Sequence, residues 1–146
     1  IPDIYVLGKA LGGGVLPVSA ITANRDIMDV FTPGSHGSTF GGNPLSCAVA
    51  LKAMEILVRD DYPKMSEEKG KYFTNKLKEI KNNQIIDIRG KGLLIGEAAP
   101  YVKVLIDNVV LAKETHEKTI RFAPPINISY ENLDKAIEII VKVLTK

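Results

Sequence analysis

The part of the sequence that most constrains the fold is a short apolar run, Ile4 to Leu7, which ends in Gly8-Lys9 and is soon followed by Gly12-Gly13-Gly14. An apolar run of this length bounded by glycine is typical of a buried β-strand. The glycines let the backbone turn sharply and leave open space beside Lys9. The segment therefore predicts a strand whose tip presents one uncrowded amine, the environment that a lysine needs to bond covalently to a flat cofactor.

A second glycine-rich stretch, His36 to Pro44, reads His-Gly-Ser-Thr-Phe-Gly-Gly-Asn-Pro. It places Ser38 and Thr39 between glycines, shortly before a helix that the apolar spacing predicts over residues 45–59. Hydroxyls and backbone N–H groups near the start of a helix suit an anion. A polar, glycine-rich stretch can equally be an ordinary mobile surface turn, so both interpretations stay open on pattern alone.

Together these segments resemble the class III, fold-type I aminotransferases, which depend on pyridoxal phosphate (PLP). The resemblance includes residues 89–96, Arg-Gly-Lys-Gly-Leu-Leu-Ile-Gly, and runs over nearly the whole chain. Lys113-Glu-Thr-His116, followed by Thr-Ile-Arg-Phe-Ala-Pro-Pro at residues 119–125, narrows it to the ornithine aminotransferases within that class. The implied fold is α/β: residues 1–59 are expected to end the large PLP-binding domain, and residues 60–146 to form a small α+β C-terminal domain.

The resemblance implies roles for three residues of the two glycine-rich segments. Lys9 would carry the PLP covalently and, once substrate displaces it, would move a proton between the substrate and the cofactor. Ser38 and Thr39 would reach the PLP phosphate of the neighbouring subunit. The active site would then be shared across a homodimer.

Arg121 interrupts an otherwise apolar strand, Thr119 to Ala123. On pattern alone this fits an arginine at a sheet edge that reaches into solvent. The resemblance implies instead that its planar guanidinium holds the carboxylate of the amino-acid substrate, or that of 2-oxoglutarate, in two parallel hydrogen bonds. We expect an anion to meet this group, because burying an unpaired charge is costly.

The activity implied by the resemblance is transfer of the δ-amino group of L-ornithine to 2-oxoglutarate, giving glutamate semialdehyde and glutamate, a step of proline and arginine metabolism. Two alternatives remain. The chain can belong to another class III ω-aminotransferase, acting on acetylornithine or 4-aminobutyrate, or it can be a non-catalytic fragment within an assembly. The family places the aromatic residue that stacks on PLP, and the aspartate that pairs with its pyridine nitrogen, upstream of the matching segment.

Composition excludes several other classes of function. The net charge is +2, and basic and acidic residues are interspersed, so there is no basic stripe for a nucleic acid. The single cysteine, Cys47, cannot form an internal disulfide and indicates a reducing, cytoplasmic location. No apolar run approaches the roughly 18 residues of a membrane span. With Cys47, His36 and His116 do not have the spacing of a metal site.

Hydrophobic spacing and turn residues predict the remaining elements. In the first domain we expect strands over 2–7 and 17–23 and helices over 25–31 and 45–59. In the second domain we expect helices over 66–81, 101–109 and 129–144, and strands over 85–89, 93–97 and 119–123.

Two places differ from the family that the chain resembles. Between Gly96 and Pro100 the family carries several more residues, which finish a strand and lead into a helix. After Asn108 the family usually has glycine, because the helix end there needs a left-handed residue. We therefore expect Val109 to adopt a backbone conformation that valine takes badly.

Overall fold

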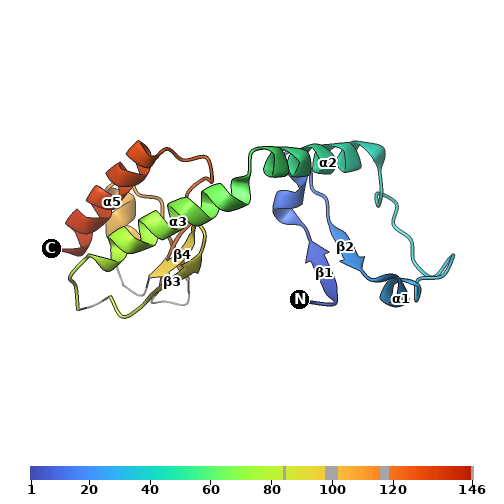
Figure 1. Ribbon diagram of the computed structural model, residues 1–146, viewed down its shortest axis with the longest axis horizontal. Helices are drawn as coiled ribbons and strands as arrows, with labels where there is room; N and C mark the ends of the chain where they lie inside the picture. Colours follow the sequence, from blue (N-terminus) through green and yellow to red (C-terminus); the bar gives the residue numbers. More distant parts are fainter. Residues whose placement is uncertain (84, 98–101, 116–118, 146) are drawn as a thin grey trace. The chain divides into compact units, whose positions relative to one another are not determined.

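The computed structural model describes residues 1–83, 85–97, 102–115 and 119–145. The chain divides into two compact units, Ile1–Asp60 and Asp61–Lys146. Both combine helices with antiparallel strands (Figure 1). Among the helices of the described ranges, none combines the length and the apolar character needed to cross a membrane.

The first unit contains two antiparallel strands, β1 (Ile4–Leu7) and β2 (Ala20–Ala23). The 3-10 helix η1 (Lys9–Gly12) lies between them in the sequence. Both strands lie within the ranges predicted for them. The residues of β1 are exposed rather than buried as we expected. The physical reason is that α2, the long helix of this unit (Pro44–Arg59), packs chiefly against η1, so the two-stranded sheet is left largely uncovered within the described residues.

The long helix of the first unit, α2 (Pro44–Arg59), begins where the sequence predicts. Asn43 caps it, because its side-chain oxygen accepts a hydrogen bond of 2.9 Å from the Ser46 N–H. The turn after η1 packs closely against this helix. Gly13 has φ +61°, and a Cβ there would lie 3.2 Å from the Cβ of Ala53. A short helix, α1 (Arg25–Met28), ends three residues before the predicted Phe31.

The second unit holds a four-stranded antiparallel sheet in the order β3-β4-β6-β5. The strands are β3 (Ile88–Lys91), β4 (Leu94–Glu97), β6 (Thr119–Phe122) and β5 (Lys113–Thr115). Three of them overlap predicted strands. The sequence analysis missed β5, because a three-residue strand of Lys, Glu and Thr has no apolar alternation to reveal it.

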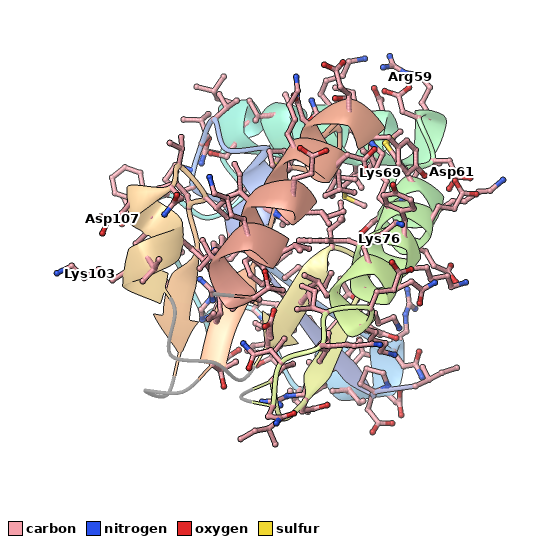
Figure 2. The ribbon with its side chains drawn as sticks, turned by 90° about the vertical axis from the view of Figure 1, so that its left-hand side faces the viewer. Arg59, Asp61, Lys69, Lys76, Lys103 and Asp107 are labelled. Carbon is pink, nitrogen blue, oxygen red and sulfur yellow. The ribbon has the colours of Figure 1, made fainter. Side chains whose placement is uncertain are left out.

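Helices α3 (Tyr62–Lys78) and α5 (Tyr130–Leu144) lie side by side against this sheet (Figures 1 and 2). Lys103 and Asp107 project outward from the short helix α4 (Val102–Asp107), as Figure 2 shows. One apolar core joins the three helices to one face of the sheet. Its buried residues are Phe73, Leu77, Leu93, Ile95, Leu105, Ile120, Phe122, Leu133, Ile137, Ile140, Val143 and Leu144.

Helix boundaries differ from prediction at one main point. Helix α3 begins at Tyr62, ahead of the predicted Ser66, and Pro63 occupies its first turn, where the missing N–H costs nothing. The expectation for Val109 is confirmed: its φ is +70°. Tyr101, where the sequence predicts the start of the next helix, and His116 lie outside the described residues.

A buried lysine ties α3 to the segment that follows β6. Lys69 is 8% exposed, and its amine donates hydrogen bonds to the carbonyl oxygens of Ile126 (3.1 Å) and Ile128 (2.5 Å). The same amine lies 5.9 Å from the ring centroid of Tyr130. Helical spacing could have revealed it, because Lys69 precedes Phe73 by four residues on the apolar stripe.

Glu97, at the end of β4, is fully buried. Neither of its carboxylate oxygens has a hydrogen-bond partner among the described residues. It pairs with Ile120 across the sheet and occupies the place where the family that the sequence resembles continues its strand. Burial raises the pKa of Glu97 to about 7, from an ordinary value of 4.5.

This burial predicts a pH dependence of stability. The folded state holds its proton up to about pH 7, whereas the unfolded state releases it near pH 4.5, so the free energy of unfolding should fall as pH rises between these values. The expected loss is at most about 3 kcal/mol. Glu97→Gln should remove this component, because glutamine does not titrate.

Urea unfolding of the wild type and of Glu97→Gln at pH 5 and pH 8 measures the effect. The exposed Glu138, changed to glutamine, is the matched control and should leave the pH dependence of the wild type unaltered. Identical pH dependence in the wild type and in Glu97→Gln would show that the carboxyl titrates normally.

Candidate functional site

Lys9 lies just beyond the tip of β1, as the sequence predicts, and its backbone is strained. Its φ is +50°, a left-handed conformation that non-glycine residues seldom adopt. Among the described residues only Asp61 and Val109 share this feature outside glycine. Such strain persists where surrounding structure imposes it and is concentrated at functional sites. The conformation therefore marks Lys9 as the first residue to consider.

Lys9 and Ser38 line the same cavity, whose volume is about 650 Å³. Two glycines of its lining border open space. Gly14 and Gly42 have positive φ, and a Cβ on either would meet nothing within 4 Å. The backbone can therefore lie close to a flat ligand. The full lining is Lys9, Gly14, Val15, Leu16, Pro17, Val18, Ser19, Ser38, Phe40, Gly41, Gly42, Asn43, Ser46 and Cys47.

The hydroxyl of Ser38 is fixed by its own loop. The Gly41 N–H donates to Ser38 Oγ at 2.9 Å, and a Cβ on Gly41 would lie 2.8 Å from the Cβ of Ser38. Because Ser38 Oγ accepts this bond, its own hydrogen stays available for an anion. Thr39 is exposed and is not among the residues that line the cavity.

The start of α2 has fewer free backbone N–H groups for an anion than we expected. Pro44 has no N–H, and the N–H groups of Ser46 and Cys47 donate to Asn43, to its side-chain and backbone oxygens respectively. Among the described residues this leaves the Leu45 N–H as the first-turn donor without a partner. Hydroxyl groups would therefore have to supply most of the hydrogen bonds to a phosphate here.

The chemistry of the residues around this cavity fits PLP. The Lys9 amine can bond to the aldehyde of PLP, and the free hydrogen of Ser38 can bond to a phosphate, which by our expectation is that of the PLP in the neighbouring subunit. Both groups border one cavity whose glycines leave room for a flat ring.

The position and the exposure of Arg121, in the second unit, differ from two of our expectations. It lies on β6, an inner strand between β4 and β5, and so not at a sheet edge. Its side chain is exposed on the face of the sheet opposite the core, because Ile120 and Phe122 on either side of it are buried. The cost of burying a charge therefore gives no support to an anion site. Among the described residues Arg121 nevertheless has no ion-pair or hydrogen-bond partner, since all described ion pairs involve other residues.

Comparison with known proteins agrees with the resemblance seen in the sequence. The model of the family described as "Aminotransferase class-III" matches residues 1–144. The ornithine aminotransferase of Brevibacillus brevis is 56% identical over 149 residues, and that of a Geobacillus species is 53% identical over 148 residues. These alignments cover 99% and 98% of this chain and 37% of each relative. The chain thus spans a little over a third of the length of these curated relatives.

Solved structures of similar proteins show the same fold. A Toxoplasma gondii ornithine aminotransferase, crystallised with oxidised glutathione and partially occupied by PLP, is 39% identical with a TM-score of 0.93. An acetylornithine aminotransferase from Elizabethkingia anophelis is 43% identical with a TM-score of 0.91. Each match covers 99% of this chain, and 36% and 41% of the respective structures. The α/β fold predicted from the sequence is confirmed.

Proposed function

Because this chain belongs to the class-III aminotransferase family, we propose that the protein transfers the δ-amino group of L-ornithine to 2-oxoglutarate, giving glutamate semialdehyde and glutamate. The family is PLP-dependent in general. The observation that supports the proposal most is the position of Lys9, which lines the same cavity as Ser38. The backbone of Lys9 is strained there, with φ +50°. Identities of 53–56% to ornithine aminotransferases support this amine donor.

Lys9 has two tasks in this proposal. Its amine binds the cofactor covalently, and substrate then displaces it. When bound, PLP withdraws electrons from the carbon that carries the substrate amine, which makes the C–H bond there acidic. The freed Lys9 amine takes up that proton and later returns it, as a general base and then a general acid.

Arg121 binds a substrate carboxylate through its planar guanidinium, which can donate two parallel hydrogen bonds. Its exposure and its lack of a partner within the described chain support this role. A cytoplasmic location and a homodimer belong to the same proposal.

Thr39 serves the phosphate of the neighbouring subunit in this proposal. Support comes from its exposed hydroxyl, which lies beside Ser38 without lining the cavity of its own chain. Thr39→Ala should therefore weaken PLP retention by about 1–3 kcal/mol, the usual value of a hydrogen bond to a charged group. Equilibrium dialysis against PLP measures the loss, and the exposed Thr32, changed to alanine, is the control.

Mixed dimers test whether the site is shared. A dimer of Thr39→Ala with Lys9→Ala contains one site in which both residues are intact, if the two come from different chains. We expect such hybrids to regain part of the activity. Verified hybrids without activity would place both residues in one chain's site.

A panel of amine donors tests the function itself. We expect kcat/KM to be highest for L-ornithine, and lower for acetylornithine and 4-aminobutyrate, with 2-oxoglutarate as acceptor. A preference for acetylornithine would contradict the proposed amine donor and would instead match the activity named for the relative from Elizabethkingia anophelis. Failure to bind PLP, together with absence of activity towards all three donors, would support a non-catalytic fragment.

A further inference from the structure

A groove of about 750 Å³ lies in the second unit, between helix α3 and the hairpin that joins β3 to β4 (Figure 1). The hairpin packs directly on the helix. A Cβ on Gly70 would lie 2.1 Å from the Gly92 carbonyl oxygen, so this position of α3 has no room for a side chain. The Leu93 N–H donates to Ser66 Oγ at 3.3 Å. Because helix and hairpin meet this closely, the two sides of the groove are held at a fixed separation.

Four lysines and one glutamate line this groove. Lys64, Lys71 and Lys78 follow one another at intervals of seven residues, which puts them on one face of α3. Lys91 lines the groove from the hairpin. Glu67 is the acidic residue of the described lining, and its carboxylate is 2.6 Å from the Lys71 amine. Four cations and one anion leave three positive charges uncompensated.

Three of these lysines have no partner among the described residues. The amines of Lys64, Lys78 and Lys91 take part in none of the described ion pairs or hydrogen bonds. The side chains of Thr74 and Asn75, which also line the groove, make no described hydrogen bond either. A concave surface lined mainly by one sign of charge concentrates ions of the opposite sign. The groove therefore attracts an anion and offers it neutral donors as well as cations.

The kind of charge favours phosphate over carboxylate. Lysine binds phosphate as a compact point charge, whereas the planar fork of arginine matches a carboxylate, and the described lining contains no arginine. It also contains no aromatic ring on which a nucleobase could stack. Successive lysines on this face of α3 are about 10 Å apart along the helix axis. That spread suits a chain of phosphate groups better than a single one.

We propose that this groove binds a compact ligand that carries several phosphate groups and no aromatic base. The two unpaired lysines that face each other across it, Lys78 on α3 and Lys91 on the hairpin, supply the main contacts. The inference does not depend on the proposed function, because no residue of this groove has a role in binding PLP or the amino-acid substrate.

The test is calorimetric titration of the purified full-length protein with inorganic tripolyphosphate at low ionic strength. We expect one ligand per chain, and weaker binding at physiological salt, because salt screens exposed charges. Lys78→Met combined with Lys91→Met should weaken binding about a hundredfold, which is about tenfold for each charge-assisted contact. Lys103→Met combined with Lys142→Met removes two exposed lysines outside the groove and should leave the affinity unaltered.

Further variants and a second ligand keep the test decisive. Lys91→Met alone should bind about tenfold more weakly, and Lys91→Arg, which keeps the charge, should bind nearly as well as the wild type. No binding to the wild type at millimolar tripolyphosphate would overturn the proposal. Equal weakening in the control pair would also overturn it, since binding would then follow overall charge. ATP that bound more than about tenfold tighter than tripolyphosphate would contradict a site without a base.

Discussion

Replacing Lys9 by alanine is expected to abolish transamination while leaving the fold intact. The variant loses both the covalent link to PLP and the amine that moves the proton, so kcat should fall by at least about a thousandfold. Stability should change little, because the Lys9 side chain is exposed and alanine meets the same left-handed backbone as lysine. Steady-state kinetics and circular dichroism measure the two effects.

Two further variants separate chemistry from charge. Lys9→Arg keeps the positive charge but has no nucleophilic amine, and it should be as inactive as the alanine variant. Lys52→Ala removes an exposed lysine of α2 that pairs with Glu55, and it should remain active. Full activity of Lys9→Arg would show that Lys9 contributes charge alone.

Changing Arg121 to lysine should raise KM for 2-oxoglutarate by about ten- to a hundredfold. Lysine keeps the charge but cannot form two parallel hydrogen bonds to one carboxylate. The fold and the absorption spectrum of bound PLP should stay unaltered, since Arg121 is exposed. Arg89→Lys, on β3 of the same sheet, is the matched control and should keep a normal KM, because Arg89 already pairs with Asp87. If Arg121→Lys bound 2-oxoglutarate normally, or lost its fold, Arg121 would have a structural role instead.

Local sequence signals predicted most of the regular structure. Asn43 and Pro44 mark the start of α2, and Ser129 caps α5 through a hydrogen bond from the Asn132 N–H. These caps depend on neighbouring residues alone, which is why a single sequence contains them. The left-handed conformation of Val109 was predicted from the resemblance instead, because the family usually has glycine after this asparagine.

Features that depend on distant partners were harder to predict. Strand alternation after Leu93 and Ile95 puts Glu97 on the core face, yet nothing local says that its carboxyl finds no partner there. The inner position of Arg121 follows from pairing with β5, a strand without an apolar pattern.

In the candidate site, too, some features follow from neighbouring residues and others from residues distant in the sequence. The apolar run before Lys9 and the glycines after it together indicated a lysine with open surroundings. That Lys9 and Ser38 border one cavity depends on the path of the intervening chain, which local pattern does not specify. The cap of α2 by Asn43 also shows that an N-terminal helix turn can use its own donors before any ligand does.

The central claim, that Lys9 carries the cofactor, is tested most directly by reduction with borohydride followed by peptide mapping. Borohydride reduces the carbon–nitrogen double bond between PLP and the lysine that holds it, which makes the attachment permanent and bleaches the visible absorption. We expect the added pyridoxyl mass on the peptide that contains Lys9. Finding it on Lys52, Lys113 or another lysine, or finding no label on a protein that retains PLP, would contradict the claim.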